Sequence, residues 1–320
     1  AVLVPQEVDD LFGALEGLRA KGMAVIFISH KLDEVLRVAD DVTVVRAGET
    51  VAEVKSKDVT ARQLAELMVG SELPQPTTHG DTRRSEVTLE LKDVSIPTAT
   101  GSRDLISHIS FNLHAGEVVG IAGVEGNGQA ELVEAIMGLR KYTGSIDFQG
   151  SSIDDMSVAH RHDLGIGLIP EDRQRQALMM DSPLWENRIL GHQRGKPVMR
   201  GFILDKKATI EDTKRIMEEF DVRAPGPMTA AAALSGGNQQ KFIVGREMSK
   251  APALLVASHP TRGVDVGAQG AIWEVLREAR TKGMAIVLIS ADLEELIGMS
   301  DRLLVMLRGV ITAELDPQKT

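Results

Sequence analysis

Two short apolar runs stand out along the chain, because each is uninterrupted by a polar residue and is bounded by turn-forming residues. They are AVIFIS at residues 24–29 and AIVLIS at residues 285–290. Runs of this length are typical of parallel strands that are covered on both faces. Each run follows a helical pattern and a Lys-Gly turn, and each precedes a serine and a second helical pattern. The pattern therefore predicts an α/β fold with a parallel core sheet.

The two runs belong to an internal repeat. Residues 18–48 and 279–309 align without gaps at an offset of 261, and 12 of 31 positions are identical. Each copy ends in a further apolar strand pattern, at residues 42–45 and 303–307, and then in Gly48 or Gly309. A repeat of this kind indicates two related structural units.

The positions of the two copies predict the domain organisation. The second copy closes a long segment that begins near Val87, whereas the first copy lies near Ala1. Residues 71–86 are polar and contain two prolines, which is typical of a linker. We expect residues 1–70 to be the C-terminal part of a first domain, 71–86 a linker, and 87–320 a complete second domain. By the same offset, about 175 residues of the first domain are expected to precede Ala1 in a longer protein.

A glycine-rich turn lies where an apolar strand pattern meets a helical one. The strand pattern VVGIAG ends at Gly123, and the helical pattern over 129–139 places Leu132, Ile136 and Leu139 on one face. Backbone N–H groups at such a turn bind phosphate. In the pattern G-x-x-x-x-G-K-[ST], Gln129 stands for the lysine and Ala130 for the hydroxyl residue. The candidate nucleotide-binding residues are Gly123, Gly126, Asn127, Gly128, Gln129 and Ala130. A tight turn without a ligand is the alternative.

A second candidate anion site is LSGGNQQK, residues 234–241. A serine hydroxyl and the backbone N–H groups of two glycines precede a helical pattern there, so a phosphate is again a suitable ligand. The candidate residues are Ser235, Gly236, Gly237, Asn238 and Gln239. The alternative is an ordinary helix N-cap after a glycine turn, but the full eight-residue string is more specific than that.

Composition excludes several other classes of function. The 36 Lys and Arg residues are outnumbered by 46 Asp and Glu, so broad nucleic-acid binding is disfavoured. The absence of cysteine excludes disulfides, thiolate metal sites and cysteine nucleophiles. No apolar run reaches the about 18 residues that a membrane-spanning helix needs. A dinucleotide oxidoreductase is disfavoured because Glu131 occupies the third glycine position of G-x-G-x-x-G.

These motifs resemble those of the ATP-binding subunits of ABC transporters, and in particular the importers of simple sugars and nucleosides, whose subunit fuses two ATPase domains. LSGGNQQK resembles their signature motif, and GVEGNGQAELVEAIMGL their second-domain phosphate loop. IPEDRQRQAL, residues 169–178, resembles the Q-loop segment, with Glu171 where glutamine is usual. HPTRGVDVGA, residues 259–268, resembles the D-loop region with Asp265. The resemblance implies a P-loop NTPase fold with a parallel core sheet, an antiparallel β subdomain and an α-helical subdomain.

The resemblance also implies that the second domain is degenerate. Ser258 and His259 stand at the positions of the Walker B Asp-Glu pair, although His259 is more simply a histidine at a strand end. Ala291 stands at the switch histidine, whose counterpart in the first copy is His30, the candidate catalytic residue. Residues 96–106, where the resembled family usually has an aromatic residue that stacks on adenine, contain none. We therefore expect weak nucleotide binding and no hydrolysis at this loop.

In the resembled family each nucleotide lies between the loop of one domain and the signature of the other. The signature over 235–239 would then close on ATP and Mg²⁺ held by the first domain, whose own loop is absent from this chain. The implied partners are two transmembrane permease subunits and an extracytoplasmic solute-binding protein, with the subunit peripheral on the cytoplasmic face of the membrane. The isolated chain is expected to bind ATP weakly and hydrolyse little of it. The solute would be a simple sugar or a nucleoside, and no nucleic-acid partner is expected.

Several alternatives stay open. The apolar residues Met179, Met180, Leu184 and Trp185 are interpreted as subdomain core or as a docking surface for the membrane subunits. Thr209 followed by Asp212 suggests a helix start. The rival functions are a soluble ribosome-associated ABC protein and an inactive pseudo-ATPase, interaction module or gene remnant.

Overall fold

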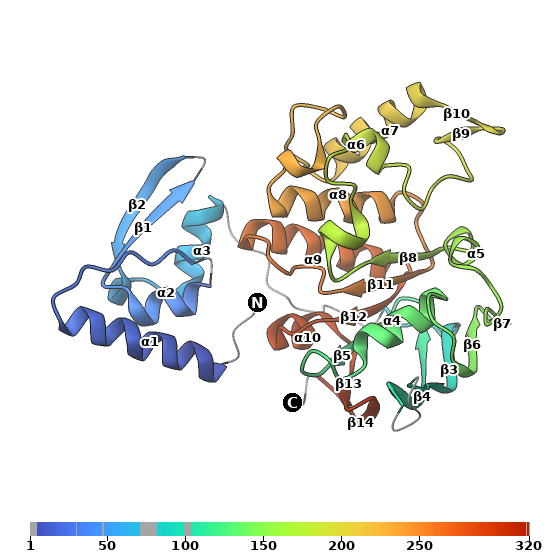
Figure 1. Ribbon diagram of the computed structural model, residues 1–320, viewed down its shortest axis with the longest axis horizontal. Helices are drawn as coiled ribbons and strands as arrows, with labels where there is room; N and C mark the ends of the chain where they lie inside the picture. The colour runs from blue at the N-terminus through green and yellow to red at the C-terminus, as the bar shows by residue number, and fades with distance from the viewer. Residues whose placement is uncertain are drawn as a thin grey trace. The chain divides into compact units, whose positions relative to one another are not determined.

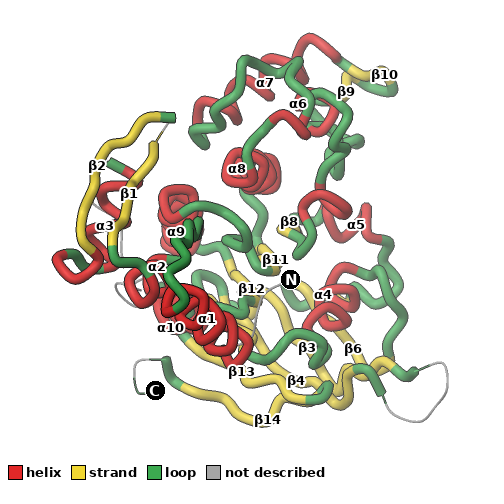
Figure 2. The backbone as a smooth tube through the Cα atoms, turned by 60° about the vertical axis from the view of Figure 1, so that its left-hand side comes forward, coloured by secondary structure: helices red, strands yellow, loops and turns green. Residues whose placement is uncertain are grey.

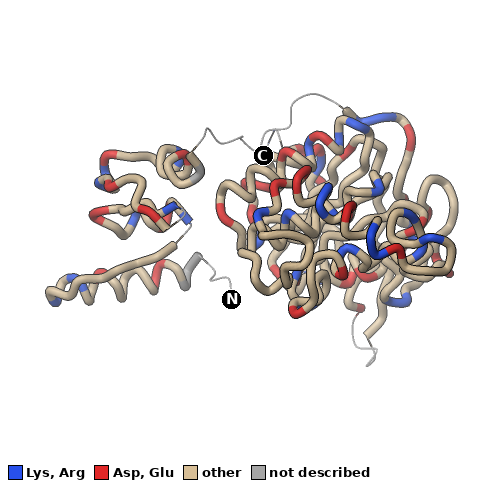
Figure 3. The backbone as a smooth tube through the Cα atoms, turned by 90° about the horizontal axis from the view of Figure 1, so that it is seen from above, with Lys and Arg blue, Asp and Glu red and all other residues tan. Residues whose placement is uncertain are grey.

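The computed structural model describes residues 5–29, 31–46, 48–70, 82–98, 104–317 and 319. The chain divides into two compact units, of which the first consists mainly of residues up to Pro74 and the second of most of the remainder (Figure 1). None of the described helices combines the length and the apolar character that a membrane crossing needs. Acidic and basic segments are interspersed along the chain of both units (Figure 3).

The first unit is a small α/β assembly of three helices and a hairpin. Its elements are α1 (Pro5–Ala20), α2 (Leu32–Val38), β1 (Asp41–Arg46), β2 (Glu49–Lys55), the 3₁₀ turn η1 (Ser56–Asp58) and α3 (Ala61–Val69). β1 and β2 pair antiparallel. Gly48, at a φ of 85°, supplies the left-handed conformation at the turn. Thr60 and Gln63 form a capping box at the start of α3.

The predicted strand over residues 24–29 is wrong. Residues 23–29 are irregular, and the side chains of Ile26 and Ile28 are each 92% exposed. A strand needs a neighbour with free backbone groups. The described residues of this unit contain a single hairpin, and its two strands pair with each other. The second copy of the repeat behaves as predicted, because β12 (Ala285–Ile289) is fully buried between two other strands.

The second unit is built on a six-stranded sheet with the order β14-β13-β5-β12-β11-β8. Its strands are β5 (Val118–Ala122), β8 (Ile166–Ile169), β11 (Leu254–Ser258), β12, β13 (Arg302–Leu307) and β14 (Val310–Leu315). All neighbours pair parallel except β14, which turns back on β13 at Gly309. The expected parallel core sheet is confirmed.

An antiparallel sheet lies over one face of this core, with the order β4-β3-β6-β7. Its strands are β3 (Val87–Ile96), β4 (Ile106–His114), β6 (Thr143–Phe148) and β7 (Ser151–Ser152). Leu89, Leu91 and Ile109 from this sheet share a buried cluster with Ile121 and Val287 of the core sheet. The expected antiparallel β subdomain is therefore present.

Helices cover the rest of the core sheet and form a region of their own (Figure 2). The elements beside the sheet are α4 (Gln129–Met137), α5 (Val158–Asp163), the π-helical turn η2 (Arg173–Ala177), α9 (Val266–Thr281) and α10 (Leu293–Met299). The expected helical subdomain comprises α6 (Leu184–Asn187), the short hairpin β9 (Met199–Arg200) and β10 (Ile203–Leu204), α7 (Lys206–Glu219), η3 (Ala231–Ala233) and α8 (Gly236–Met248).

Three local expectations need adjustment. α4 ends at Met137, because Gly138 takes a φ of 73°, and Leu139 is exposed rather than on the buried face. α7 lies within residues 206–222, where a helical pattern is expected, but its N-cap is Asp205 and not Thr209, whose buried hydroxyl donates to the carbonyl of Asp205. Four apolar residues at 179–185 are open to interpretation as subdomain core or as a docking surface for membrane subunits. Leu184 and Trp185 are buried and only Met179 is exposed, which favours the interpretation as subdomain core.

The packing of α8 on α7 depends on a glycine. A Cβ added at Gly245 would lie 2.7 Å from side-chain atoms of both Ile216 and Phe220. We expect Gly245→Val to lower the free energy of unfolding by about 1–3 kcal/mol, since an overpacked core must shift its neighbours. Gly226→Val is the matched control, because a Cβ at Gly226 meets nothing within 4 Å and its change should stay within about 0.5 kcal/mol. Chemical denaturation measures both, and equal losses would contradict the packing argument.

Candidate functional site

The glycine-rich turn lies at the carboxyl end of β5, between the parallel neighbours β12 and β13. Gly126 and Gly128 take φ values of 85° and 108°, and Gly128 is the N-cap of α4. Close contacts also require glycine, because a Cβ at Gly123 would lie 2.5 Å from the carbonyl oxygen of Met306. The turn therefore has the strand-to-helix position that the sequence predicts for a phosphate loop.

The side chain of Gln129 folds back onto this loop instead of pointing away from it. Its Oε1 accepts a hydrogen bond from the backbone N–H of Asn127 at 3.0 Å, and its Nε2 donates to the carbonyl of Val124 at 3.1 Å. Gln129 is only 7% exposed. One N–H group that a phosphate would need is thus already paired inside the protein, so an incoming phosphate must displace Gln129.

Asn127 fixes the same loop to the turn between β13 and β14. Its Oδ1 accepts from the backbone N–H of Arg308 at 2.6 Å, and its carbonyl accepts from Gly309 at 2.8 Å. Its Nδ2 donates to Val124 at 2.8 Å. Asn127 is therefore held by the protein itself, whereas Ala130 is exposed at the start of α4 and offers no hydroxyl.

Beside the loop lies a cluster of two carboxylates that share one guanidinium group. Glu125 of the loop and Glu171 of the Q-loop segment are both salt-bridged to Nη1 of Arg262, at 3.1 and 2.7 Å. A ligand atom of His259 lies within 4.8 Å of both carboxylates. The guanidinium already occupies the place between the carboxylates, so this cluster needs no metal ion.

The end of β11 does not fit Mg²⁺. Ser258 is buried, and His259 follows at a φ of 50°. Burial chiefly lowers the pKa of His259, while the nearby Glu171 raises it. A hard cation such as Mg²⁺ prefers carboxylate and other oxygen ligands, and here a serine and a largely uncharged imidazole stand instead. Ala291, after β12, is exposed and has no titratable group.

The signature segment forms the N-terminus of α8. The Oγ of Ser235 caps the helix, accepting weakly from the N–H of Asn238 at 3.4 Å and from its Nδ2 at 3.0 Å. Ser235 is exposed, Gly236 is half-buried and Gly237 is buried. The exposed helix start presents N–H groups and a positive dipole end, which suit an anion.

Gln239, a predicted nucleotide-binding residue, has its side chain inside the protein. It is 3% exposed, and its Nε2 donates to the carbonyls of Ala231 and Leu234 at 3.1 and 3.2 Å. Its Oε1 accepts from Nε of Arg173 at 3.3 Å. The side chain of Gln239 therefore positions the signature segment, and we do not expect it to contact a ligand directly.

Arg173, which the sequence reasoning missed, links three motifs. Its guanidinium donates to Gln239 of the signature helix and to the carbonyls of Arg262 and Gly263 at 2.6 and 3.1 Å. Burial lowers its pKa. Nothing in the spacing of residues within RQRQA distinguishes Arg173, which is half-buried, from Arg175, which is exposed.

Glu295 is a second residue that the sequence reasoning missed. This fully buried carboxyl accepts from the hydroxyls of Thr261 and Ser290 at 2.9 and 2.6 Å and from the indole of Trp273 at 2.8 Å. Burial raises its pKa. Glu295 thereby connects the segment after β11, the end of β12 and α9, and it positions the backbone at this edge of the sheet.

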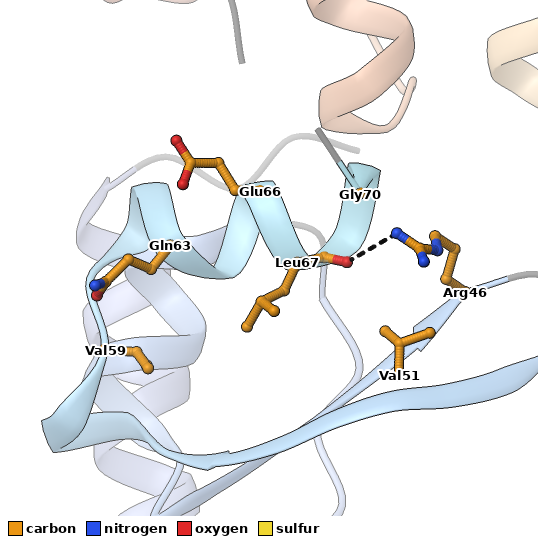
Figure 4. A pocket seen from close by; sticks show the side chains of 7 residues that line it. All are labelled: Arg46, Val51, Val59, Gln63, Glu66, Leu67 and Gly70. Carbon is orange, nitrogen blue, oxygen red and sulfur yellow. Dashed lines mark hydrogen bonds between the residues drawn. The ribbon is translucent and has the colours of Figure 1, made fainter. Parts of the chain in front are cut away.

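Two predicted residues lie outside the segments described above. Asp265 is exposed and immediately precedes α9. His30 lies outside the described residues, as do residues 71–81 of the predicted linker. The first unit has a shallow pocket between its hairpin and α3 (Figure 4). It is lined by Arg46, Val51, Val59, Gln63, Glu66, Leu67 and Gly70, none of which belongs to a predicted motif.

Residues 106–262 match the family described as ABC transporter. The second unit is also similar to a nucleotide-free ATP-binding cassette of an ABC transporter, at a TM-score of 0.61 and 23% identity over 72% of this chain and 91% of that one. A dimeric cassette bound to ADP and Pi gives a TM-score of 0.62 at 20% identity, covering 72% and 98%. The second unit has the ABC ATPase fold. The expected P-loop NTPase fold is thereby confirmed.

The chain is also similar to curated proteins that are named as import ATP-binding proteins. The chain is 40% identical to the nucleoside import ATP-binding protein NupA of Lactococcus lactis, over 100% of the chain and 63% of that protein. It is 39% identical to the guanosine import protein NupO of Bacillus subtilis, with the same coverage, and 37% identical to the ribose import protein RbsA of Lacticaseibacillus paracasei, over 99% and 62%. The chain is thus a homologue of sugar and nucleoside import ATP-binding proteins, and spans less than two thirds of their length.

The position of the Gln129 side chain allows a test of how strongly the loop binds ATP. We expect Gln129→Lys to raise the affinity for ATP by about 10- to 100-fold, because a charge-assisted hydrogen bond contributes about 1.5–3 kcal/mol. The substitution also removes the acceptor that occupies the N–H of Asn127. Titration with a fluorescent ATP analogue measures the change. Gln193→Lys, at an exposed position, is the control for added charge, and an equal gain in that variant would contradict the argument.

Proposed function

We propose that this chain is part of the ATP-binding subunit of an ABC importer for a nucleoside or a simple sugar. Its second domain supplies the signature segment to an ATP site on another ABC ATPase domain and does not hydrolyse ATP at its own loop. The observation that carries the proposal is the contrast between the exposed cap at Ser235 and the loop filled by Gln129.

The asymmetry has a physical basis in the two motifs. At the loop, the lysine and the hydroxyl are replaced by Gln129 and Ala130, and the neighbouring carboxylates Glu125 and Glu171 are paired with Arg262. Phosphoryl transfer depends on positioning and on stabilisation of negative charge, and these replacements remove both. The start of α8 keeps the backbone and hydroxyl donors that can contact a triphosphate held elsewhere.

We also propose that residues 1–70 are the end of the first ABC ATPase domain and that His30 is its switch histidine. The gapless repeat supports this assignment, because His30 aligns with Ala291 at the end of β12. ATP and Mg²⁺ would be bound by the rest of that first domain. Two permease subunits and an extracytoplasmic solute-binding protein would complete the transporter, with this subunit peripheral on the cytoplasmic face.

The proposal is tested by adding to the chain an ATP site that can hydrolyse ATP. The N-terminal part of the lactococcal relative, upstream of its match to this chain, is fused to residues 1–320, and ATP hydrolysis is compared with that of the unfused chain. We expect hydrolysis in the fusion alone. Ser235→Arg should then lower its rate by about 100-fold, because it removes a donor aimed at the transferring phosphate.

The control is Ala232→Arg, an exposed residue in η3 that adds the same charge beside the helix without occupying its start. Full hydrolysis in the Ser235→Arg fusion would refute the role of the signature segment. Hydrolysis by the unfused chain at the rate of the fusion would refute the claim that its own loop is inactive.

A further inference from the structure

A buried cluster of two histidines and one glutamate lies away from the nucleotide motifs. His162 is at the end of α5, His192 follows α6, and Glu247 is near the end of α8. One ligand atom from each residue lies within 4.8 Å of the others. The cluster therefore joins the segment before β8, the helical subdomain and the signature helix.

The imidazole of His192 is buried without a hydrogen-bond partner among the residues that the structure describes. His192 is 1% exposed, and neither of its ring nitrogens is paired with any described group. Within the same described residues, Nδ1 of His162 is likewise buried and unpaired. Leaving a buried polar atom unpaired costs about 1–3 kcal/mol, so such atoms in a folded protein call for a ligand or a solvent molecule.

The geometry between the groups is compatible with a shared ion. Nε2 of His162 lies 3.4 Å from Oε2 of Glu247, and ligands of a tetrahedral Zn²⁺ at bond lengths of about 2.0–2.2 Å are separated by a similar distance. The rings of His162 and His192 are 4.9 Å apart between centroids and nearly perpendicular. They are thus not stacked face to face, and both rings can present an edge nitrogen.

Neighbouring groups hold the carboxylate in place. Nε of Arg246 donates to Oε1 of Glu247 at 2.9 Å, and the backbone N–H of Leu168 approaches Oε2 at 3.4 Å. Such outer contacts orient a ligand for its metal. The cationic Arg188, paired with Asp212, and the nearby Lys250 work against an added positive charge, so nitrogen ligands rather than charge must provide the affinity.

We propose that His162, His192 and Glu247 form a binding site for a single Zn²⁺ ion, with water as the remaining ligand. Two imidazoles and one carboxylate are a donor set that zinc accepts. The ion would satisfy the unpaired imidazoles and tie the C-terminal part of α8 to the elements beside β8. This site is independent of the nucleotide loop and of the proposed transport function.

The experiment titrates the metal-free full chain with Zn²⁺ alone by calorimetry and follows Co²⁺ binding by visible absorption. We expect one equivalent of Zn²⁺, an intense tetrahedral Co²⁺ spectrum, and a higher melting temperature with zinc. His192→Gln and His162→Gln should each weaken binding by at least about 100-fold, since loss of even an outer-shell partner costs about 10- to 100-fold.

His160→Gln is the matched control, because His160 is an exposed histidine on the same helix, α5. It should bind zinc as the unchanged chain does. The proposal is overturned if the unchanged chain binds no zinc, if Co²⁺ gives only a weak octahedral spectrum, or if zinc binding survives in His192→Gln. It is also overturned if His160→Gln loses binding equally. The Co²⁺ spectrum of the unchanged chain decides the question if both His→Gln variants fail to fold.

Discussion

The parallel pairing of β5 with β12 on one side and β13 on the other determines where the chemistry of the second unit lies. Because parallel strands end at a common edge, the loop after β5 lies at the same edge as the end of β11, where Ser258 and His259 lie. Glu295 then links Thr261 to Ser290 across the same edge. The position of the loop after β5 therefore follows from the hydrogen bonds of the sheet.

The glycine-rich loop has the strand-to-helix position of a phosphate loop, although Gln129 stands where that motif has a lysine. Converging N–H groups in a strand-to-helix turn need an acceptor, and the Oε1 of Gln129 provides one to Asn127. Each hydrogen bond of this kind contributes only about 0.5–1.5 kcal/mol net. A phosphate must displace it without the help of a lysine and beside the carboxylates of Glu125 and Glu171. The competition for the N–H group of Asn127 is therefore decided by small energetic terms.

Comparison of the two copies of the repeat shows which elements depend on the local sequence and which depend on neighbouring strands. Both copies form the expected second helix, last strand and glycine turn, because hydrophobic periodicity and turn chemistry are local. The apolar runs diverge: residues 285–289 form a buried strand, whereas Ile26 and Ile28 are exposed. At the site, the glycines and Ser235 were predictable from their spacing. Arg173 and Glu295 were not, because their partners come from segments about 66 to 90 and 5 to 34 residues away.

The two ends of α8 differ in their exposure to solvent. The N-terminal end presents Ser235 to solvent, while Arg173 and Gln239 hold the backbone behind it. Toward the C-terminal end, Arg246 and Glu247 are buried, and Arg246 donates to the carbonyls of Ala177 and Asn187. A helix fixed by buried polar contacts at one end can present a preorganised group at the other at little entropic cost. The exposed signature segment is thus positioned chiefly by side chains on and beside α8 itself, through the contacts of Gln239 and Arg173 at one end and of Arg246 at the other.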